Sequence, residues 1–360
     1  MSKESKRNPY EKKTTSFYDS AYVNELSHYT KMGNSFYSGK RKATPKKAKE
    51  EPKTKNPTKI SSSWTPKEIF DAFEEEVYGL QSYKQAVSIF IWKILNGYRP
   101  KGALLIVGQS GSGKTELMRV LQKLYPCMHV MDGSNAVNSS YKGDNNIQSN
   151  VVVLSKLAKE HPNMPPILVI DEFDKFVIND SHSGQENHLV ALPELYRLIE
   201  GTQFVYKDDK KEGLAMVDVS DMVFIFTGSF ADAADKKHNE MGFTSTQDAK
   251  HKNLSKIPTI DEVKKLLPPE LRGRIEDIIL SEELNEEDYV NILKNKNYSP
   301  IVRIGNEYGL KIKASNTFIT RMAKEAYESG VGVRLLNTTV MHEVNKHLFE
   351  NPDVKTITLK

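Results

Sequence analysis

The chain has one cysteine among its 360 residues and no long apolar run. The single Cys127 excludes an internal disulfide and a cysteine-rich zinc site. The longest apolar runs, such as Ala103–Val107 and Ile167–Ile170, are far shorter than the roughly 18 residues that a membrane-spanning helix needs. The first ten residues, MSKESKRNPY, carry charge but no apolar segment, which is not the pattern of a secretory signal. We therefore expect a cytoplasmic protein without membrane association.

Large aliphatic residues are scarce in residues 1–63, where only Val23, Leu26 and Ile60 occur. This segment holds 15 Lys and Arg against 6 Asp and Glu, a net charge of +9, whereas the rest of the chain carries a net charge of −5. Its last part, KRKATPKKAKEEPKTKNPTK, is rich in Lys and Pro. Because so little apolar area cannot offset the entropy lost on ordering, we expect residues 1–63 to form a disordered basic tail and linker.

The tail also contains aromatic residues scattered among its charges, which leaves three interpretations open. Basic and aromatic side chains together are typical of single-stranded nucleic acid binding. The same composition suits a segment that docks on a protein partner, or a solvated leader that binds nothing. The sequence does not decide among them.

The pattern changes at Trp64, where amphipathic helices begin. Thr65 is a helix N-cap residue followed by Pro66 at the first helical position, with Glu68 in the first turn. A second helix is predicted over residues 83–95. The run Ala103–Val107 then has the composition of a buried strand.

A phosphate-binding loop follows that strand directly. Its sequence GQSGSGKT matches the pattern G-x-x-x-x-G-K-[ST], and it stands between a predicted strand and a predicted helix over residues 116–124. Backbone N–H groups of such a loop surround the phosphates, the lysine reaches the β- and γ-phosphates, and the hydroxyl contacts Mg²⁺. The predicted ATP-binding residues of this loop are Gly108, Gln109, Ser110, Gly111, Ser112, Gly113, Lys114 and Thr115.

Two carboxylates and a threonine follow two further apolar strands. Asp171 and Glu172 come at the end of the run Ile167–Ile170, and Thr227 ends the run Met222–Phe226. Because ligands bind at the carboxyl ends of parallel strands, we expect Asp171 to hold Mg²⁺ with Thr115, Asp171 acting through water. Glu172 is predicted to polarise the attacking water. Thr227 is predicted to orient that water, the alternative being a cap for the next helix.

The order of strands and helices from Ala103 to Phe226 predicts an α/β fold with a parallel sheet and helices on both faces. We expect this large ATPase domain to span residues 64–281. Residues 282–360 show helical spacing followed by an alternating strand pattern over Val354–Leu359. They are predicted to form a small, mainly helical lid domain.

These motifs together resemble the AAA+ ATPases, and within them the Clp unfoldases of the ClpX type, over about residues 64–352. The resemblance implies an ATPase that works as a hexameric ring with ATP and Mg²⁺. Val77 and Tyr78 lie in a segment similar to the one that contacts adenine in the family. The segment PELRGR resembles the one that carries the arginine finger, which implies that Arg274 enters the ATP site of the neighbouring subunit, with Arg272 as the competing residue. Gly332-Val333-Arg334 resembles the sensor-2 motif, which implies that Arg334 contacts the nucleotide.

The resemblance also implies contacts with protein substrates. Tyr141, Lys142 and Gly143 are similar to the family's aromatic pore loop, although Lys142 stands where an aliphatic residue is usual. Polar and glycine-rich flanks suit an exposed loop, the alternative being a Tyr141 packed on a neighbouring helix. Residues 203–216 are predicted to form a hairpin that is a candidate second pore loop.

Two features depart from the ClpX pattern. A Lys-rich tail stands where ClpX has a zinc-binding domain. Met241, Gly242 and Phe243 are similar to the tripeptide with which ClpX docks on the ClpP peptidase, but the connecting segment is short, and a local turn is the alternative.

The leading functional hypothesis is therefore an ATP-dependent protein unfoldase or remodelling ATPase. A nucleic-acid-associated AAA+ ATPase of the helicase-loader type is one alternative, with contacts from the basic tail and Lys142. A nucleotide-dependent assembly factor that hydrolyses ATP slowly is the other.

Overall fold

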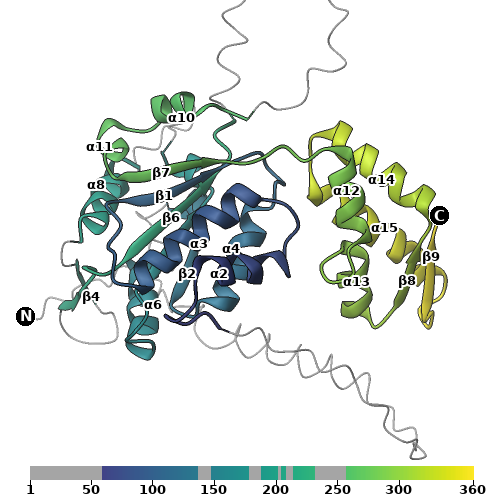
Figure 1. Cartoon of the computed structure of the whole chain (residues 1–360), viewed down its shortest axis with the longest axis horizontal. Helices are drawn as coiled ribbons and strands as arrows, with labels where there is room; N and C mark the ends of the chain where they lie inside the picture. Colours follow the sequence, from purple (N-terminus) through teal and green to yellow (C-terminus); the bar gives the residue numbers. More distant parts are fainter. Residues whose placement is uncertain (1–58, 137–146, 178–187, 202–203, 208–213, 232–256) are drawn as a thin grey trace, which may run out of the picture. The chain divides into compact units, whose positions relative to one another are not determined.

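The structure is a computed structural model that describes residues 59–136, 147–177, 188–201, 204–207, 214–231 and 257–360. The larger part begins with two helices and continues into alternating strands and helices (Figure 1). Its helices are α2 (Pro66–Glu74), α3 (Gln81–Leu95), α4 (Lys114–Leu124), α5 (Gly133–Ala136), α6 (Ile147–Glu160), α7 (Phe173–Val177), α8 (His188–Ile199), α10 (Ile260–Leu266) and α11 (Pro269–Arg272). Its strands are β1 (Ala103–Val107), β2 (Met128–Asp132), β3 (Ile167–Asp171), β4 (Phe204–Lys207), β5 (Leu214–Val217), β6 (Val223–Gly228) and β7 (Ile275–Leu280).

Five of these strands form one parallel sheet in the order β2-β3-β6-β1-β7. The central strands β1 and β6 are buried along their whole length, which explains their uninterrupted apolar sequences. Leu105, Ile170 and Phe226 belong to the core on one face, with residues of α6, α7 and α8. Leu104, Val169 and Ile225 belong to the core on the other face, with residues of α2, α3 and α4. The predicted parallel sheet with helices on both faces is confirmed.

The local sequence sets the start of helix α2. Thr65 is the N-cap of α2, and its hydroxyl accepts from the backbone N–H of Glu68 at 3.3 Å. The Glu68 carboxylate accepts in turn from the backbone N–H of Thr65 at 2.7 Å. This reciprocal capping box satisfies two N–H groups that lack partners within the helix, at the N-cap that the sequence predicted.

The predicted hairpin over residues 203–216 is also present. Strands β4 and β5 pair antiparallel, with Phe204 opposite Val217 and Lys207 opposite Leu214. The hairpin follows the end of α8 and precedes β6, so it joins two elements of the central fold.

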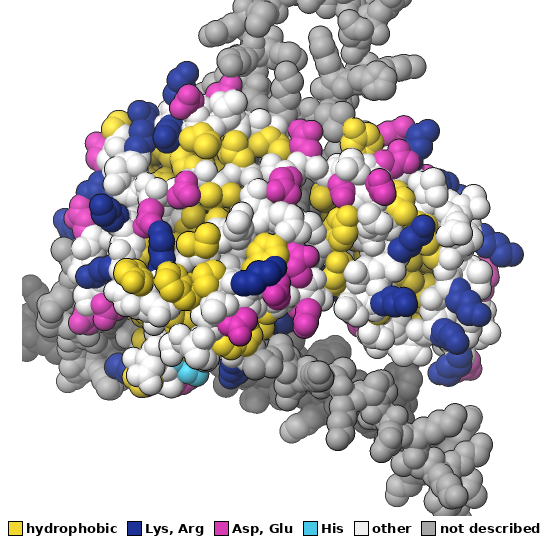
Figure 2. All heavy atoms as spheres, in the orientation of Figure 1, with side chains coloured by type: hydrophobic (Ala, Val, Ile, Leu, Met, Phe, Trp, Pro, Cys, Tyr) yellow, Lys and Arg dark blue, Asp and Glu magenta, His cyan; other side chains and the backbone are white. Residues whose placement is uncertain are grey.

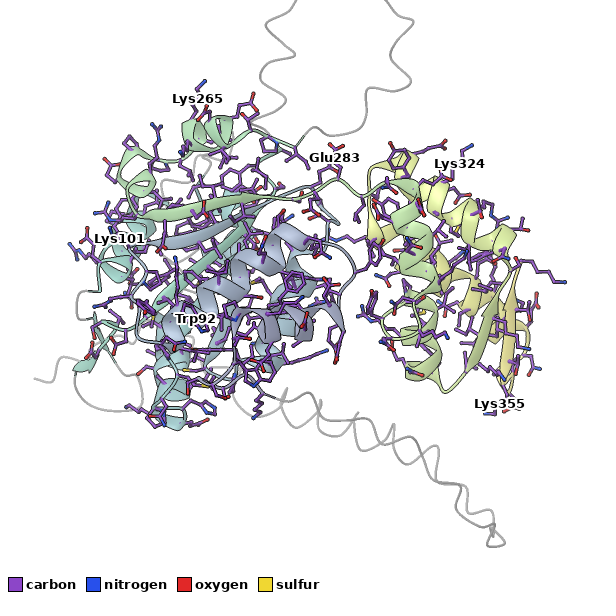
Figure 3. All side chains as sticks on the ribbon, in the orientation of Figure 1. Trp92, Lys101, Lys265, Glu283, Lys324 and Lys355 are labelled. Carbon is purple, nitrogen blue, oxygen red and sulfur yellow. The ribbon has the colours of Figure 1, made fainter. Side chains whose placement is uncertain are left out.

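The C-terminal part has its own core. It contains helices α12 (Glu286–Lys294), α13 (Pro300–Tyr308), α14 (Asn316–Ser329) and α15 (Val333–Glu350), and strands β8 (Lys311–Ala314) and β9 (Thr356–Leu359). The two strands pair in parallel, and Phe318, Leu336 and Ile357 are among the residues buried between them and the helices. Glu283, labelled in Figure 3, lies in the connection from β7 to α12. The mainly helical lid is confirmed, whereas α13 and β8 were not predicted, and the boundary at residues 281 and 282 stays a prediction.

The surface drawn in Figure 2 carries both acidic and basic side chains, with exposed apolar side chains among them. Among the residues that the structure describes, none of the helices combines the length and the apolar character that crossing a bilayer requires. The predicted tail, up to residue 58, lies outside the described residues.

Cys127 provides a probe of this fold. It is fully buried, and burial raises the pKa of its thiol to about 11. At pH 8 the native chain then holds roughly a hundredfold less thiolate than an unfolded chain with an ordinary thiol. We expect a maleimide to label the native protein at least about 100-fold more slowly than the urea-unfolded protein. Native labelling within tenfold of the unfolded rate would contradict this packing.

Candidate functional site

The P-loop joins the carboxyl end of β1 to the start of α4, as the sequence predicted. Gly113 is the N-cap of α4, with φ at 99°, in the left-handed region that glycine adopts without strain. Lys114 is 8% exposed, and its ammonium donates to the carbonyl oxygens of Gly108 at 2.5 Å and Gln109 at 2.8 Å. Burial lowers the pKa of Lys114 to about 8, although the nearby Asp171 carboxylate opposes that shift. The loop carbonyls thus hold the ammonium at the place where a polyphosphate would compete for it.

Asp171 receives two hydroxyl groups from neighbouring elements. Thr115 donates to its Oδ2 at 2.8 Å, and Thr227 donates to its Oδ1. Thr227 is fully buried at the end of β6, and its hydroxyl is directed to the Asp171 carboxylate, whereas the next helix beyond Ala231 lies outside the described residues. The chain brings together carboxylate and hydroxyl oxygens, which are the donors that Mg²⁺ prefers. These residues therefore fit the predicted magnesium site.

Glu172 follows Asp171 with its backbone in the left-handed region, at φ 53°. This conformation is uncommon for a residue with a side chain, and such residues cluster at functional sites. The Glu172 N–H donates to Asp171 Oδ1 at 3.0 Å. The next residue, Phe173, is buried and stacks on Phe226, with ring centroids 4.0 Å apart. The packed Phe173 and the paired Asp171 fix the backbone on both sides of Glu172, whose side chain is exposed toward the cavity.

Asp174 is a site residue that the sequence did not single out. It is 7% exposed, and its Oδ2 accepts from the Ser229 hydroxyl at 2.7 Å. Both residues line the same cavity as Glu172. The short spacing from Asp171, within Asp-Glu-Phe-Asp, was the only signal in the sequence that Asp174 would lie there.

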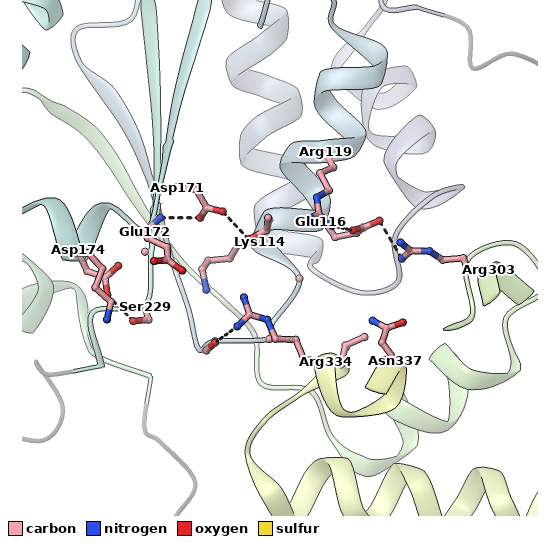
Figure 4. A pocket seen from close by; sticks show the side chains of 17 residues that line it. Lys114, Glu116, Arg119, Asp171, Glu172, Asp174, Ser229, Arg303, Arg334 and Asn337 are labelled. Carbon is pink, nitrogen blue, oxygen red and sulfur yellow. Dashed lines mark hydrogen bonds and ion pairs between the residues drawn. The ribbon is translucent and has the colours of Figure 1, made fainter. Parts of the chain in front are cut away.

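The cavity has a volume of about 410 Å³, which is within the range of small-ligand sites. Figure 4 shows the P-loop lysine and the carboxylates on one side and residues of the lid on the other. The described residues that line it include Ser110, Gly111, Gly113, Lys114, Thr115, Glu116, Asp171, Glu172, Gly228, Ser229, Arg303, Arg334 and Asn337.

The lid contributes two arginines to this cavity. Arg334, at the start of α15, donates to the Ser110 hydroxyl at 3.2 Å. Arg303, on α13, forms an ion pair with Glu116 at 3.3 Å (Figure 4). Arg334 was predicted here from its motif. Arg303 was missed because its partner is far away in the sequence and neither residue belongs to a motif.

The lid also contacts the P-loop through the backbone. The Val333 N–H donates to the Gly111 carbonyl at 3.3 Å. A Cβ at Gly111 would lie 2.2 Å from the carbonyl oxygen of Val331, and one at Gly332 would lie 2.8 Å from that of Gly111. Side chains at these two positions would therefore separate the lid from the P-loop.

Val77 and Tyr78 lie away from the cavity residues that the structure describes. Val77 is buried in the core beside α2 and α3, and its carbonyl accepts from the buried Lys84 ammonium. The Tyr78 hydroxyl donates to Asp288 Oδ1 at 3.0 Å and accepts from Asn291 at 3.1 Å, both on α12. Tyr78 thus contacts the lid, and the adenine contact expected for these two residues stays a prediction.

Arg274 lies at the amino ends of strands β1 and β7, the end of the sheet opposite to the P-loop. It directly precedes β7, and its carbonyl accepts from the N–H of Ala103, the first residue of β1. The five residues of β1 therefore separate Arg274 from its own P-loop, a span of roughly 16 Å. Its guanidinium pairs with Glu200, with Nε 3.1 Å from Oε1. The competing Arg272 instead donates to the Leu267 carbonyl at 2.9 Å.

Two predicted elements lie outside the described residues. They are the pore loop with Tyr141, Lys142 and Gly143, and the tripeptide Met241, Gly242 and Phe243.

Comparison with known proteins agrees with this geometry. Residues 99–278 match the model of the AAA domain (Cdc48 subfamily). The chain is 26% identical to the ATP-dependent Clp protease ATP-binding subunit ClpX of Treponema denticola over 329 residues, covering 81% of this chain and 78% of that protein. It is 24% identical to ClpX 2 of Wolinella succinogenes over 328 residues, covering 81% and 79%.

A ClpX 3 of Methylococcus capsulatus is 26% identical over 283 residues, covering 70% of this chain and 64% of that protein. The family match spans half of the chain and includes the P-loop, Asp171, Glu172, Thr227 and Arg274. The chain therefore belongs to the AAA domain family (Cdc48 subfamily) and is a ClpX-like AAA+ ATPase.

Proposed function

We propose that this chain is an ATP-driven protein unfoldase or remodelling enzyme that works as a ring, with six subunits as in the family it resembles. The observation that carries the proposal is that the residues expected to act on ATP lie in two separate places in the subunit. Four residues converge on one cavity, whereas Arg274 stands at the amino ends of the strands, away from it; the four are Lys114, Asp171, Glu172 and Arg334. Because Arg274 does not reach the cavity of its own subunit, the arginine finger that the resemblance implies has to come from a second subunit.

The residues of the cavity have distinct roles in hydrolysis. Lys114 leaves its loop carbonyls and pairs with the β- and γ-phosphates of ATP. Glu172 polarises a water that attacks the γ-phosphorus in line, while the bond to the bridging oxygen breaks to give ADP and phosphate. Thr115 and Asp171 would hold Mg²⁺, which supplies charge neutralisation at the phosphates when it is bound. Arg334 and the neighbouring subunit's Arg274 add positive charge where negative charge develops.

The role of Thr227 follows from its partner. Because its hydroxyl donates to Asp171, Thr227 holds that carboxylate in place at the carboxyl end of the sheet. We infer that Thr227 affects the attacking water through the Asp171 carboxylate that its hydroxyl contacts. Thr227→Val keeps the shape of the side chain and removes the hydroxyl, so its rate of ATP hydrolysis tests what the hydrogen bond to Asp171 contributes.

The substrate is the finer part of the proposal. The relatives' names include Clp protease subunits, which supports a protein substrate and a peptidase partner for this chain. Met241, Gly242 and Phe243 are the candidate peptidase contact. The pore-loop residues Tyr141, Lys142 and Gly143, with the β4–β5 hairpin, are the candidate contacts with a threaded polypeptide.

Stimulation of hydrolysis separates this function from its alternatives. We expect a permanently unfolded model protein to raise the rate of ATP hydrolysis, and single-stranded DNA or RNA to leave it unchanged. Stimulation by nucleic acid alone would favour the helicase-loader alternative and a role of the basic tail in binding it. A rate that neither polymer changes would favour an assembly factor. Lys114→Ala, which lacks the phosphate-binding ammonium, is the background control.

Tyr141→Ala tests the threading step. We expect the number of ATP molecules hydrolysed per unfolded substrate molecule to rise at least about tenfold, because an aromatic side chain offers bulk and a polar edge for transient grip at low entropic cost. Tyr141→Phe keeps the ring and is the matched control, which should stay within about threefold of the wild type. Unfolding of a tagged substrate by Tyr141→Ala at the wild-type efficiency would remove this residue from the pore-loop assignment.

A further inference from the structure

Each nitrogen of the Arg274 guanidinium has a partner within its own subunit. Nε lies 3.1 Å from Glu200 Oε1, and Nη2 pairs with the same oxygen. Nη1 donates to the carbonyl of Glu270. The guanidinium carbon lies 5.0 Å from the centroid of the Tyr196 ring. Each of the three nitrogens that would bind a phosphate in the neighbouring subunit therefore has a partner.

Two of these partners belong to the end of α8. Tyr196 and Glu200 are four residues apart, so they lie on the same side of the last helical turn, and the Glu200 N–H donates to the Tyr196 carbonyl at 3.0 Å. The last turn of α8 and the residue that follows it thus contact Arg274 with an aromatic face and a carboxylate. A carboxylate next to the guanidinium neutralises the charge that a phosphate would need.

Glu200 is also directly connected to the β4–β5 hairpin. Gly201 follows it with φ at 73°, and β4 begins at Phe204. A Cβ at Gly201 would lie 3.1 Å from Arg99 Nη2 and 3.4 Å from the Ser220 carbonyl oxygen, so the chain turns in a confined space. Three residues of sequence separate Glu200 from Phe204, the first residue of β4, so we expect a displacement of the hairpin to act on Glu200.

We propose that Glu200 is a positioning residue that holds Arg274 away from the neighbouring nucleotide, and that movement of the β4–β5 hairpin by a polypeptide substrate releases it. The proposal rests on the function proposed above, in which Arg274 acts in the neighbouring subunit. It adds a route by which substrate contact raises hydrolysis, because the released guanidinium binds the γ-phosphate in place of Glu200.

Glu200→Gln in the full chain tests the proposal, since it keeps the shape of the side chain and removes its charge. The loss of a partly exposed ion pair changes an equilibrium constant by a factor of roughly two to five, which sets the size of the expected effect. We expect basal ATP hydrolysis to rise about two- to fivefold, and the further stimulation by an unfolded model protein to fall toward one. Glu200→Asp, which keeps the carboxylate, should stay closer to the wild type.

Glu276→Gln is the matched control. Glu276 lies two residues after Arg274 and forms an ion pair with Lys93 at 3.2 Å, which is also partly exposed. Its replacement removes a carboxylate within β7 that does not pair with Arg274, so both the basal rate and the stimulation should stay at wild-type values. An equal rise in both variants would overturn the proposal, because it would reflect the loss of charge alone.

The double variant Glu200→Gln, Arg274→Ala separates this proposal from the one on which it rests. We expect the double variant to be as inactive as Arg274→Ala, because Glu200 acts only through Arg274. A gain that persists without Arg274, or a basal rate that falls in Glu200→Gln at an unchanged affinity for ATP, would overturn the role of Glu200. Normal hydrolysis by Arg274→Ala alone would instead overturn the proposed role of Arg274.

Discussion

Glu172→Gln is expected to bind ATP with an affinity close to that of the wild type and to hydrolyse it at less than a tenth of the wild-type rate. The amide is nearly the same size as the carboxylate, so the backbone at φ 53° and the packing of Phe173 are preserved. What is lost is the negative charge that polarises the attacking water. A factor of 10²–10⁴ is typical for the loss of a positioned general base.

The measurement is a steady-state assay of phosphate release together with a titration of ATP binding. Lys114→Ala is the contrasting variant, because it should lose binding as well as hydrolysis. Glu172→Gln should also retain bound ATP long enough for client proteins to be identified by what purifies with it. A variant that retains more than a tenth of the wild-type turnover would remove Glu172 from its assigned role.

Arg274→Ala is expected to lose hydrolysis and to keep its affinity for nucleotide. Its position beside Ala103, at the far end of β1 from the P-loop, means that it does not reach the ATP of its own subunit. The loss should be rescued by mixing with Lys114→Ala subunits, which carry Arg274 but do not bind ATP productively. An intact site then forms wherever an Arg274→Ala subunit has a Lys114→Ala neighbour on the correct side.

Arg272→Ala is the matched control for this experiment. Arg272 lies two residues away but donates to the carbonyls of Leu267 and Lys265, at 2.9 and 3.4 Å. We expect its loss to loosen the connection of α10 to α11 and to leave hydrolysis largely intact. If the mixture of Arg274→Ala and Lys114→Ala subunits shows no activity above that of either variant alone, the assignment of Arg274 to the neighbouring site fails.

The sequence predicted the elements that combine a buried strand with polar residues at its end. The runs before Gly108, Asp171 and Thr227 are apolar on both faces, and ligands of parallel sheets bind at the carboxyl ends of such strands. Strand β7 was not predicted, because its sequence IEDIIL lies at the sheet edge and keeps two acidic residues exposed. A half-exposed edge strand has no clear apolar pattern.

The lid was less predictable for a related reason. Strand β8 consists of the four residues Lys311–Ala314 and exists through its pairing with β9, 45 residues later in the chain. The ion pair of Arg303 with Glu116 and the contact of Tyr78 with Asp288 join residues that are still farther apart. Local patterns carry no information on such pairs, whereas Arg334 belongs to a motif and was found.

The close approach of Gly111 and Gly332 has an evolutionary consequence. The lid is aligned with the P-loop by main-chain atoms, with the Val333 N–H bound to the Gly111 carbonyl, and main-chain atoms are the same in every sequence. As long as both glycines remain, the outer surface of the lid is free to diverge without shifting Arg334 relative to the phosphates. Lids with very different surfaces, suited to different neighbours, are therefore compatible with one unchanged ATP-binding geometry.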